Sequence, residues 1–157
     1  MNKPAKIAAS TVSPDYNADG YGWAMAQGAL LRQRHFDAID WDNVAEEIET
    51  MGRSERSAYS SQLVRVLLHM LKWEAQPKRR GMSWWLSIMN GRDDALRALR
   101  ENPSLKPELG DIHQNSLDYA RRKAWIETGI ARSVFDAIEI SPADAFEREF
   151  PRPESND

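Results

Sequence analysis

The spacing of apolar side chains in residues 54–75 constrains the fold more than any other feature of the sequence. Five of them fall on one helical face at the 3.6-residue period: Tyr59, Leu63, Val66, Leu67 and Met70. No segment shows a convincing two-residue alternation typical of a half-buried strand. A helix with such a face buries it against other helices when no sheet is present. The sequence therefore predicts an all-α protein.

Start and stop signals divide the chain into five main predicted helices and a short C-terminal one, packed as a compact bundle. The main helices are expected at 16–34, at 40–51 with Asp40 as N-cap, at 54–75 with Ser54 as N-cap, from Ser83 to the break at "NPS", and at 105–127 with Gly129 as stop. Ser141 and Pro142 begin the short helix, since they suit the cap and the first helical position.

The second and third helices are expected to form a hairpin about Gly52. On the second, Val44, Ile48 and Met51 form a stripe that is predicted to be buried. Glu46 and Glu49 project on the outer side, whereas Glu47 lies on the flank of the stripe.

Length and composition restrict the class of protein. The chain has 157 residues, which fits a single helical domain over 15–153, with a disordered leader at 1–14 and a tail at 154–157. It contains no cysteine, which excludes disulfides and zinc–thiolate or iron–sulfur sites. No run is long and apolar enough for a signal peptide or a membrane span. We expect a cytoplasmic protein without metal or cofactor.

Candidate site residues come from three helices. His69 lies on the shoulder of the apolar face, where it is either a general base or a structural hydrogen bonder. Arg92 projects from an apolar face and needs a partner, because an unpaired buried guanidinium is costly. Glu47 is the preferred partner and Glu55 the second choice; alternatively, Arg92 holds an anionic ligand.

The charge pattern is uneven along the chain. Residues 37–51 hold six acids and no base, and residues 53–100 hold ten bases and four acids, a balance of +6. Basic side chains interleaved with tryptophans in residues 72–85 are one way to bind single-stranded nucleic acid. The simpler interpretation is that the tryptophans are core and the bases surround a solvated turn.

Four stretches of the sequence also resemble those of a known protein family. "DGYGWAMAQGALLRQRHFDAIDWDNVAEEIETMGRSER", "LLHMLKWEAQP", "NPSLKPEL" and "FDAIEISPADAFEREFPRP" together resemble the bacterial family called domain of unknown function 29, over residues 15–153. The resemblance implies an all-helical fold and no established activity, cofactor or partner. Nine positions match its recurrent pattern, none with a known role: Trp23, Glu47, Gly52, His69, Lys72, Trp73, Gln76, Trp84 and Arg92.

Three functions remain open. The favoured one is a non-enzymatic module that binds a protein partner or itself, since no catalytic motif occurs and the acidic and basic blocks are complementary. The second is nucleic-acid binding through residues 72–85. The third is an enzyme, or a binder of small anions, that uses Glu47, His69 and Arg92 beside a pocket. The candidate ligand-binding residues there are Trp73, Trp84, Lys72 and Gln76.

Overall fold

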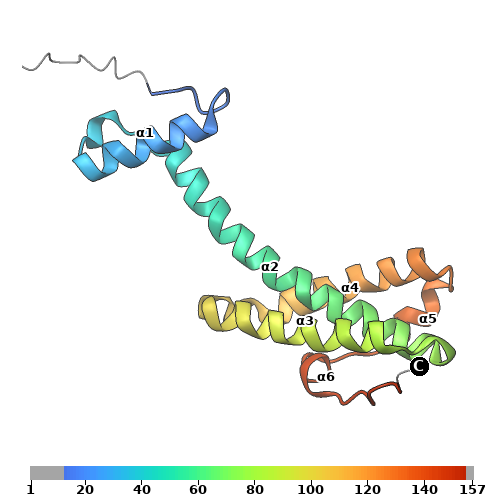
Figure 1. Cartoon of the computed structure of the whole chain (residues 1–157). Coiled ribbons are helices and arrows are strands. Elements are labelled where there is room, and N and C mark those ends of the chain that lie inside the picture. Colours follow the sequence, from blue (N-terminus) through green and yellow to red (C-terminus); the bar gives the residue numbers. More distant parts are fainter. Residues whose placement is uncertain (1–12, 155–157) are drawn as a thin grey trace, which may run out of the picture. The chain divides into compact units, whose positions relative to one another are not determined.

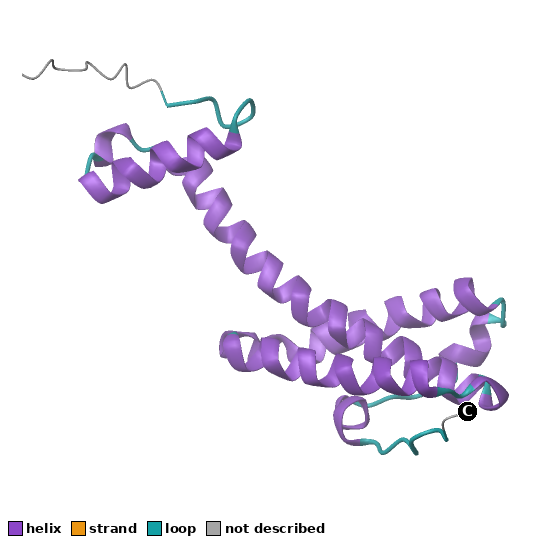
Figure 2. Ribbon diagram, viewed as in Figure 1, coloured by secondary structure: helices purple, strands orange, loops and turns teal. Residues whose placement is uncertain are grey.

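The computed structural model describes residues 13–154 of the chain, and these residues form helices joined by short connections (Figures 1 and 2). The elements are α1 (Gly20–Gln33), η1 (Phe36–Ala38), α2 (Trp41–Ala75), η2 (Pro77–Arg79), α3 (Met82–Glu101), η3 (Pro103–Glu108), α4 (Leu109–Thr128), α5 (Arg132–Asp136) and α6 (Pro142–Glu147). No strand occurs between residues 13 and 154. The all-α prediction is confirmed.

The chain divides after Met51 into two compact units, which we describe separately. The N-terminal unit comprises the described residues up to Met51, and the C-terminal unit those from Gly52 onward. The prediction of one domain over 15–153 stays a prediction. Most of the predicted leader and of the predicted tail lies outside the described residues.

Helix α2 corrects the predicted hairpin about Gly52. It runs without interruption from Trp41 to Ala75, so Gly52 is an interior helical residue and Ser54 caps nothing. A glycine in a helix interior costs only about 1 kcal/mol relative to alanine, which is too little by itself to end a helix. The described chain therefore has four long helices and two short ones rather than five main helices and one.

The N-terminal unit is held together around Asp40. The indole Nε1 of Trp23 donates to Oδ2 of Asp40 at 3.1 Å, and Oε1 of Gln27 accepts from the Asp40 backbone N–H at 2.9 Å. Both α1 side chains are buried. Hydrogen bonds from Asn43, then from Trp23, lower the pKa of the Asp40 carboxyl. Asp40 also accepts from the backbone N–H of Asn43, as expected of an N-cap.

In the C-terminal unit, α3 and α4 lie alongside the second part of α2 (Figure 1). The expected apolar face of residues 59–70 is buried there. At Gly91 the backbones of α2 and α3 come so close that an added Cβ would lie 2.8 Å from Cγ2 of Val66. A larger residue at this position would push the two helices apart.

The chain after α4 follows the predicted stop and start signals. Gly129 ends α4 in the left-handed region at φ 69°, which favours glycine. Ser141 and Asp144 form a capping box at the start of α6, in which each side chain bonds the other's backbone N–H. These hydrogen bonds, chiefly those from Ser141, lower the pKa of Asp144 to about 2. Both sequence predictions are confirmed.

None of the helices between residues 13 and 154 combines the length and the apolar character that crossing a membrane requires.

Candidate functional site

Three of the predicted site residues, His69, Lys72 and Trp84, come together in the C-terminal unit. Nδ1 of His69 lies 2.7 Å from the carbonyl oxygen of Arg65. Because a carbonyl only accepts, Nδ1 carries the proton of the neutral ring. Partial burial, with further contributions from Lys72 and Arg65, lowers the pKa of His69 despite that hydrogen bond. The ring is therefore neutral at pH 7, with Nε2 free to accept.

Lys72 is the second member of this cluster. Its Nζ donates to Oε2 of Glu127 at 2.9 Å and lies 5.2 Å from the centre of the Trp84 ring. A cation between a carboxylate and an aromatic face is held in place by both. The sequence analysis missed Glu127, which lies 55 positions from Lys72. The contact between the two residues depends on the packing of α4 against α2.

Trp73 faces the interior of the unit, and Gln76 lies at the connection after α2. Trp73 is 4 % exposed and packs edge-on against Phe150 with ring centres 5.5 Å apart. Its other neighbour is Arg80, which donates to the Trp73 carbonyl at 2.8 Å. Gln76 accepts from Arg79 through Oε1. Trp73 is thus a core residue. This agrees with the simpler interpretation of residues 72–85, in which the tryptophans belong to the core.

A ring that stacks on a nucleic-acid base needs an open face. Trp73 offers none, and Trp85 is partly buried, with its Nε1 bonded to the Phe150 carbonyl at 3.0 Å. Nucleic-acid binding through residues 72–85 stays a prediction.

Arg92 is buried, but its partners differ from those expected. Its Nε donates to the Ala145 carbonyl at 2.7 Å, and its Nη2 donates to the carbonyls of Asp144 and Arg148 at 3.2 and 2.8 Å. Its guanidinium carbon also lies 5.3 Å from the centre of the Phe150 ring. The expected pairing with Glu55 is therefore wrong, because backbone carbonyls at the end of α6 accept from the guanidinium group. The pairing with Glu47, which belongs to the N-terminal unit, stays a prediction.

The two glutamates have partners of their own. Glu47, in the N-terminal unit, accepts from the hydroxyl of Tyr16 at 2.5 Å, which raises the pKa of that tyrosine. Glu55 accepts from the amide of Asn102 at 3.1 Å. The geometry thus brings Lys72 beside His69 and Trp84, and brings both Trp73 and Arg92 into contact with Phe150. The enzymatic hypothesis stays a prediction.

The apolar stripe beside Glu47 is the largest departure from the sequence analysis. Ile48 is 61 % and Met51 63 % exposed, while Val44 is partly buried. The prediction that these three are buried is wrong, because the returning helix that was to cover them does not form. Trp41, at 54 % exposure, extends the same face.

A signal for this continuity exists in the sequence. Ile48 and Val66 are 18 residues apart, as are Trp41 and Tyr59, which corresponds to five full turns of an α-helix. Apolar positions that stay in phase across Gly52 indicate one helix rather than a hairpin.

No group of three or more side chains of the types that ligate metals gathers within residues 13–154.

Comparison with known proteins identifies the family of the chain. Residues 16–150 match the family described as Domain of unknown function DUF29. The chain belongs to the DUF29 family. Searches among curated proteins and among solved structures gave no match. Membership in DUF29 attaches no activity to His69, Arg92 or Glu47.

Proposed function

We propose that this DUF29 chain is a protein-interaction module that binds a partner helix along the first part of α2. The observation that supports it is a stripe in which Trp41, Ile48 and Met51 are exposed and Val44 is partly buried. Their spacing of three, four and three residues is that of a coiled-coil seam.

The exposure of these side chains has a free-energy cost that a partner would remove. Burying a large apolar side chain contributes roughly 1.5–3 kcal/mol. Single exposed apolar residues are normal at a protein surface, but a line of them along one helical face marks an interaction site.

The charge around the stripe favours a basic partner. Residues 37–51 carry six acids and no base. Glu47 lies on the flank of the stripe, where a lysine or arginine at the edge of a coiled-coil interface would meet it. A second copy laid over the same segment would oppose like charges, so we favour a different helix with an apolar seam and basic flanks.

A peptide titration tests this proposal. One helical peptide carries leucines at the a and d positions and lysines at e and g; its matched control carries glutamates at e and g. We expect the full chain to bind the lysine peptide and not the glutamate peptide, with affinity that falls as salt rises. Fluorescence anisotropy of the labelled peptide measures both.

Substitutions locate the binding. Ile48→Ser and Met51→Ser should abolish binding of the lysine peptide. Leu96→Ser on α3 should not change it, although Leu96 is also an exposed apolar side chain, at 38 %. Binding that survives both stripe substitutions would contradict the proposal, as would failure to bind either peptide. A dimer of the full chain in sedimentation velocity, lost in Ile48→Ser, would assign the stripe to a second copy instead.

A further inference from the structure

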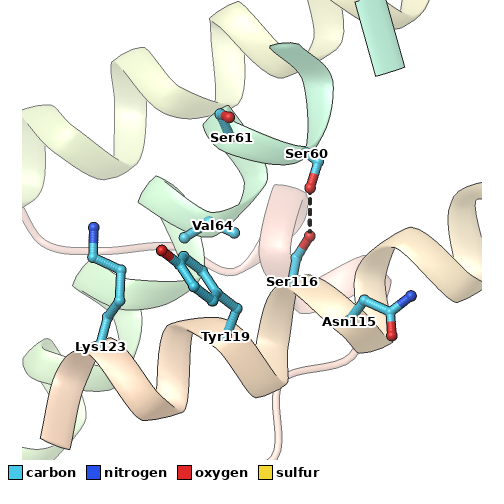
Figure 3. A pocket seen from close by; sticks show the side chains of 7 residues that line it. All are labelled: Ser60, Ser61, Val64, Asn115, Ser116, Tyr119 and Lys123. Carbon is cyan, nitrogen blue, oxygen red and sulfur yellow. Dashed lines mark hydrogen bonds between the residues drawn. The ribbon is translucent and has the colours of Figure 1, made fainter. Parts of the chain in front are cut away.

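A pocket of about 340 Å³ lies in the C-terminal unit between α2 and α4, on residues that the sequence analysis did not single out. In Figure 3, Ser60 of α2 faces Ser116 of α4, and Val64 of α2 lies beside the ring of Tyr119. The lining residues are Ser60, Ser61, Val64, Asn115, Ser116, Tyr119 and Lys123.

The lining of the pocket offers hydrogen-bond donors and one positive charge but no negative charge. It contains hydroxyls, an amide and one ammonium group, and no carboxylate. Lys123 has no acidic partner within the described chain, although 24 acids occur in the sequence. Asn115 and Tyr119 likewise make no side-chain hydrogen bond among residues 13–154, so their donors are available to a ligand.

A pair of serines forms the inner part of the pocket. Ser116 is 2 % exposed, and its Oγ lies 3.3 Å from Oγ of Ser60 (Figure 3). Each hydroxyl carries one proton, and the bond between them uses only one. Whichever serine donates, the other keeps a proton for a third acceptor.

The acids nearest Lys123 along α4 are engaged elsewhere. Asp118 pairs with Arg121 at 3.5 Å, and Glu127 accepts from Lys72 at 2.9 Å. The positive charge of Lys123 is therefore not neutralised by a neighbouring ion pair of its own.

We propose that this pocket binds a small organic oxyanion, a carboxylate or a phosphate group on an apolar body. Lys123 extends along the ring of Tyr119, away from the serine pair (Figure 3), so its flexible side chain turns toward the serines when the anion binds. The anion then accepts from Lys123 and from the serine pair, because hydrogen bonds to an ionised group are the strongest that these donors can make. The apolar body packs on Val64 and on the ring of Tyr119, which is 55 % exposed. This site is separate from the α2 stripe, and neither proposal depends on the other.

A titration of the full ¹⁵N-labelled chain by NMR tests the proposal. The probes are phenyl phosphate, benzoate and inorganic phosphate, with benzylamine as a cation that has the same ring. We expect saturable shifts at the amides of Ser61, Asn115, Tyr119 and Lys123 with phenyl phosphate or benzoate, weaker binding of inorganic phosphate, and none of benzylamine. A stronger response to phenyl phosphate than to benzoate would identify the phosphate group as the ligand chemistry, and the reverse order the carboxylate.

Two lysine substitutions separate this site from general charge attraction. Lys123→Met should weaken binding about tenfold or more, and Lys106→Met, which removes the same charge outside the pocket, should leave it unchanged. Circular dichroism establishes that both variants are folded. Ser116→Ala removes one hydroxyl of the serine pair without changing the charge, and it should also weaken binding of the organic anion. Shifts confined to other surfaces, or equal affinity in the two lysine variants, would overturn the proposal, as would no shift at millimolar concentrations of either organic anion.

Discussion

Nε of Arg92 on α3 donates a hydrogen bond of 2.7 Å to the carbonyl oxygen of Ala145 in α6, 53 residues further along the chain. Two more hydrogen bonds from the same guanidinium group reach the carbonyls of Asp144 and Arg148. The last carbonyls of a helix lack partners within it, and here an arginine from another helix donates to those of Ala145 and Arg148 and adds a second donor to that of Asp144, which also accepts from the Arg148 backbone N–H. Arg92 thereby fixes the C-terminal segment to the body of the unit.

Replacing Arg92 should therefore be costly. Arg92→Met removes three hydrogen bonds and leaves the Ala145 carbonyl without this buried donor, so we expect the free energy of unfolding to fall by about 3 kcal/mol. Urea denaturation measures this change. Arg97→Met on the same helix removes only the exposed pair with Asp94 and should cost less than about 1 kcal/mol. Equal stabilities for the two variants would contradict a structural role for Arg92.

The close approach at Gly91 gives a second prediction. Gly91→Ala should destabilise the protein by about 1–3 kcal/mol despite the higher helix propensity of alanine, because its Cβ would overlap Cγ2 of Val66. Gly110→Ala is the matched change on α4, where no atom lies within 4 Å of the added Cβ, and it should be neutral or slightly stabilising. Thermal unfolding compares the two. If Gly91→Ala is the more stable variant, α2 and α3 do not approach as described.

Gly52 tests the continuity of α2. No atom lies within 4 Å of a Cβ added there, so Gly52→Ala should stabilise the protein by about 0.5–1 kcal/mol through helix propensity alone. Gly52→Pro should lower helicity and stability, since proline breaks a helix interior. Circular dichroism with thermal melting measures both effects. A loss of stability in Gly52→Ala would indicate a turn rather than a continuous helix at this position.

The capping box of α6 predicts a response to acid. The pKa of Asp144 is lowered from 3.8 to about 2 in the folded chain, so the unfolded chain takes up this proton first as the pH falls. The stability contributed by this carboxylate is present above about pH 3.8 and is lost as the pH falls through about 2. Asp144→Asn should be less stable than the wild type at neutral pH, with the difference narrowing over that window in chemical denaturation. A constant difference would exclude this carboxylate as the titrating group.

His69 predicts a second pH effect with its own window. Burial lowers its pKa below 6.5, so the unfolded chain binds the proton before the folded one does. Stability should therefore decrease as the pH falls below about 6.5, until the folded histidine also titrates. NMR titration of the His69 ring gives the folded pKa directly, and His69→Gln should flatten the stability profile in this range. A measured pKa above 6.5 would contradict the assignment.

The predicted site residues show where sequence reasoning ends. That Arg92 needs a buried acceptor followed from its place on an apolar face, but the choice of Glu47 rested on an assumed hairpin. Lys72 and Trp84 were placed near each other by their closeness to a short turn, which is local information. Glu127 came from another helix and carried no such signal.

The sequence by itself determined the helical class, the buried face of residues 59–70, the stop at Gly129 and the start at Ser141, because these depend on hydrogen bonds and periodicities within a few residues. Tertiary structure decided that Arg92 binds two carbonyls of α6 and that of Arg148 just after it, and that Ile48 and Met51 face outward. Those outcomes depend on which distant segments pack together. A glycine such as Gly52 is compatible with either a turn or a continuous helix, and its local preference of about 1 kcal/mol is too small to choose between them.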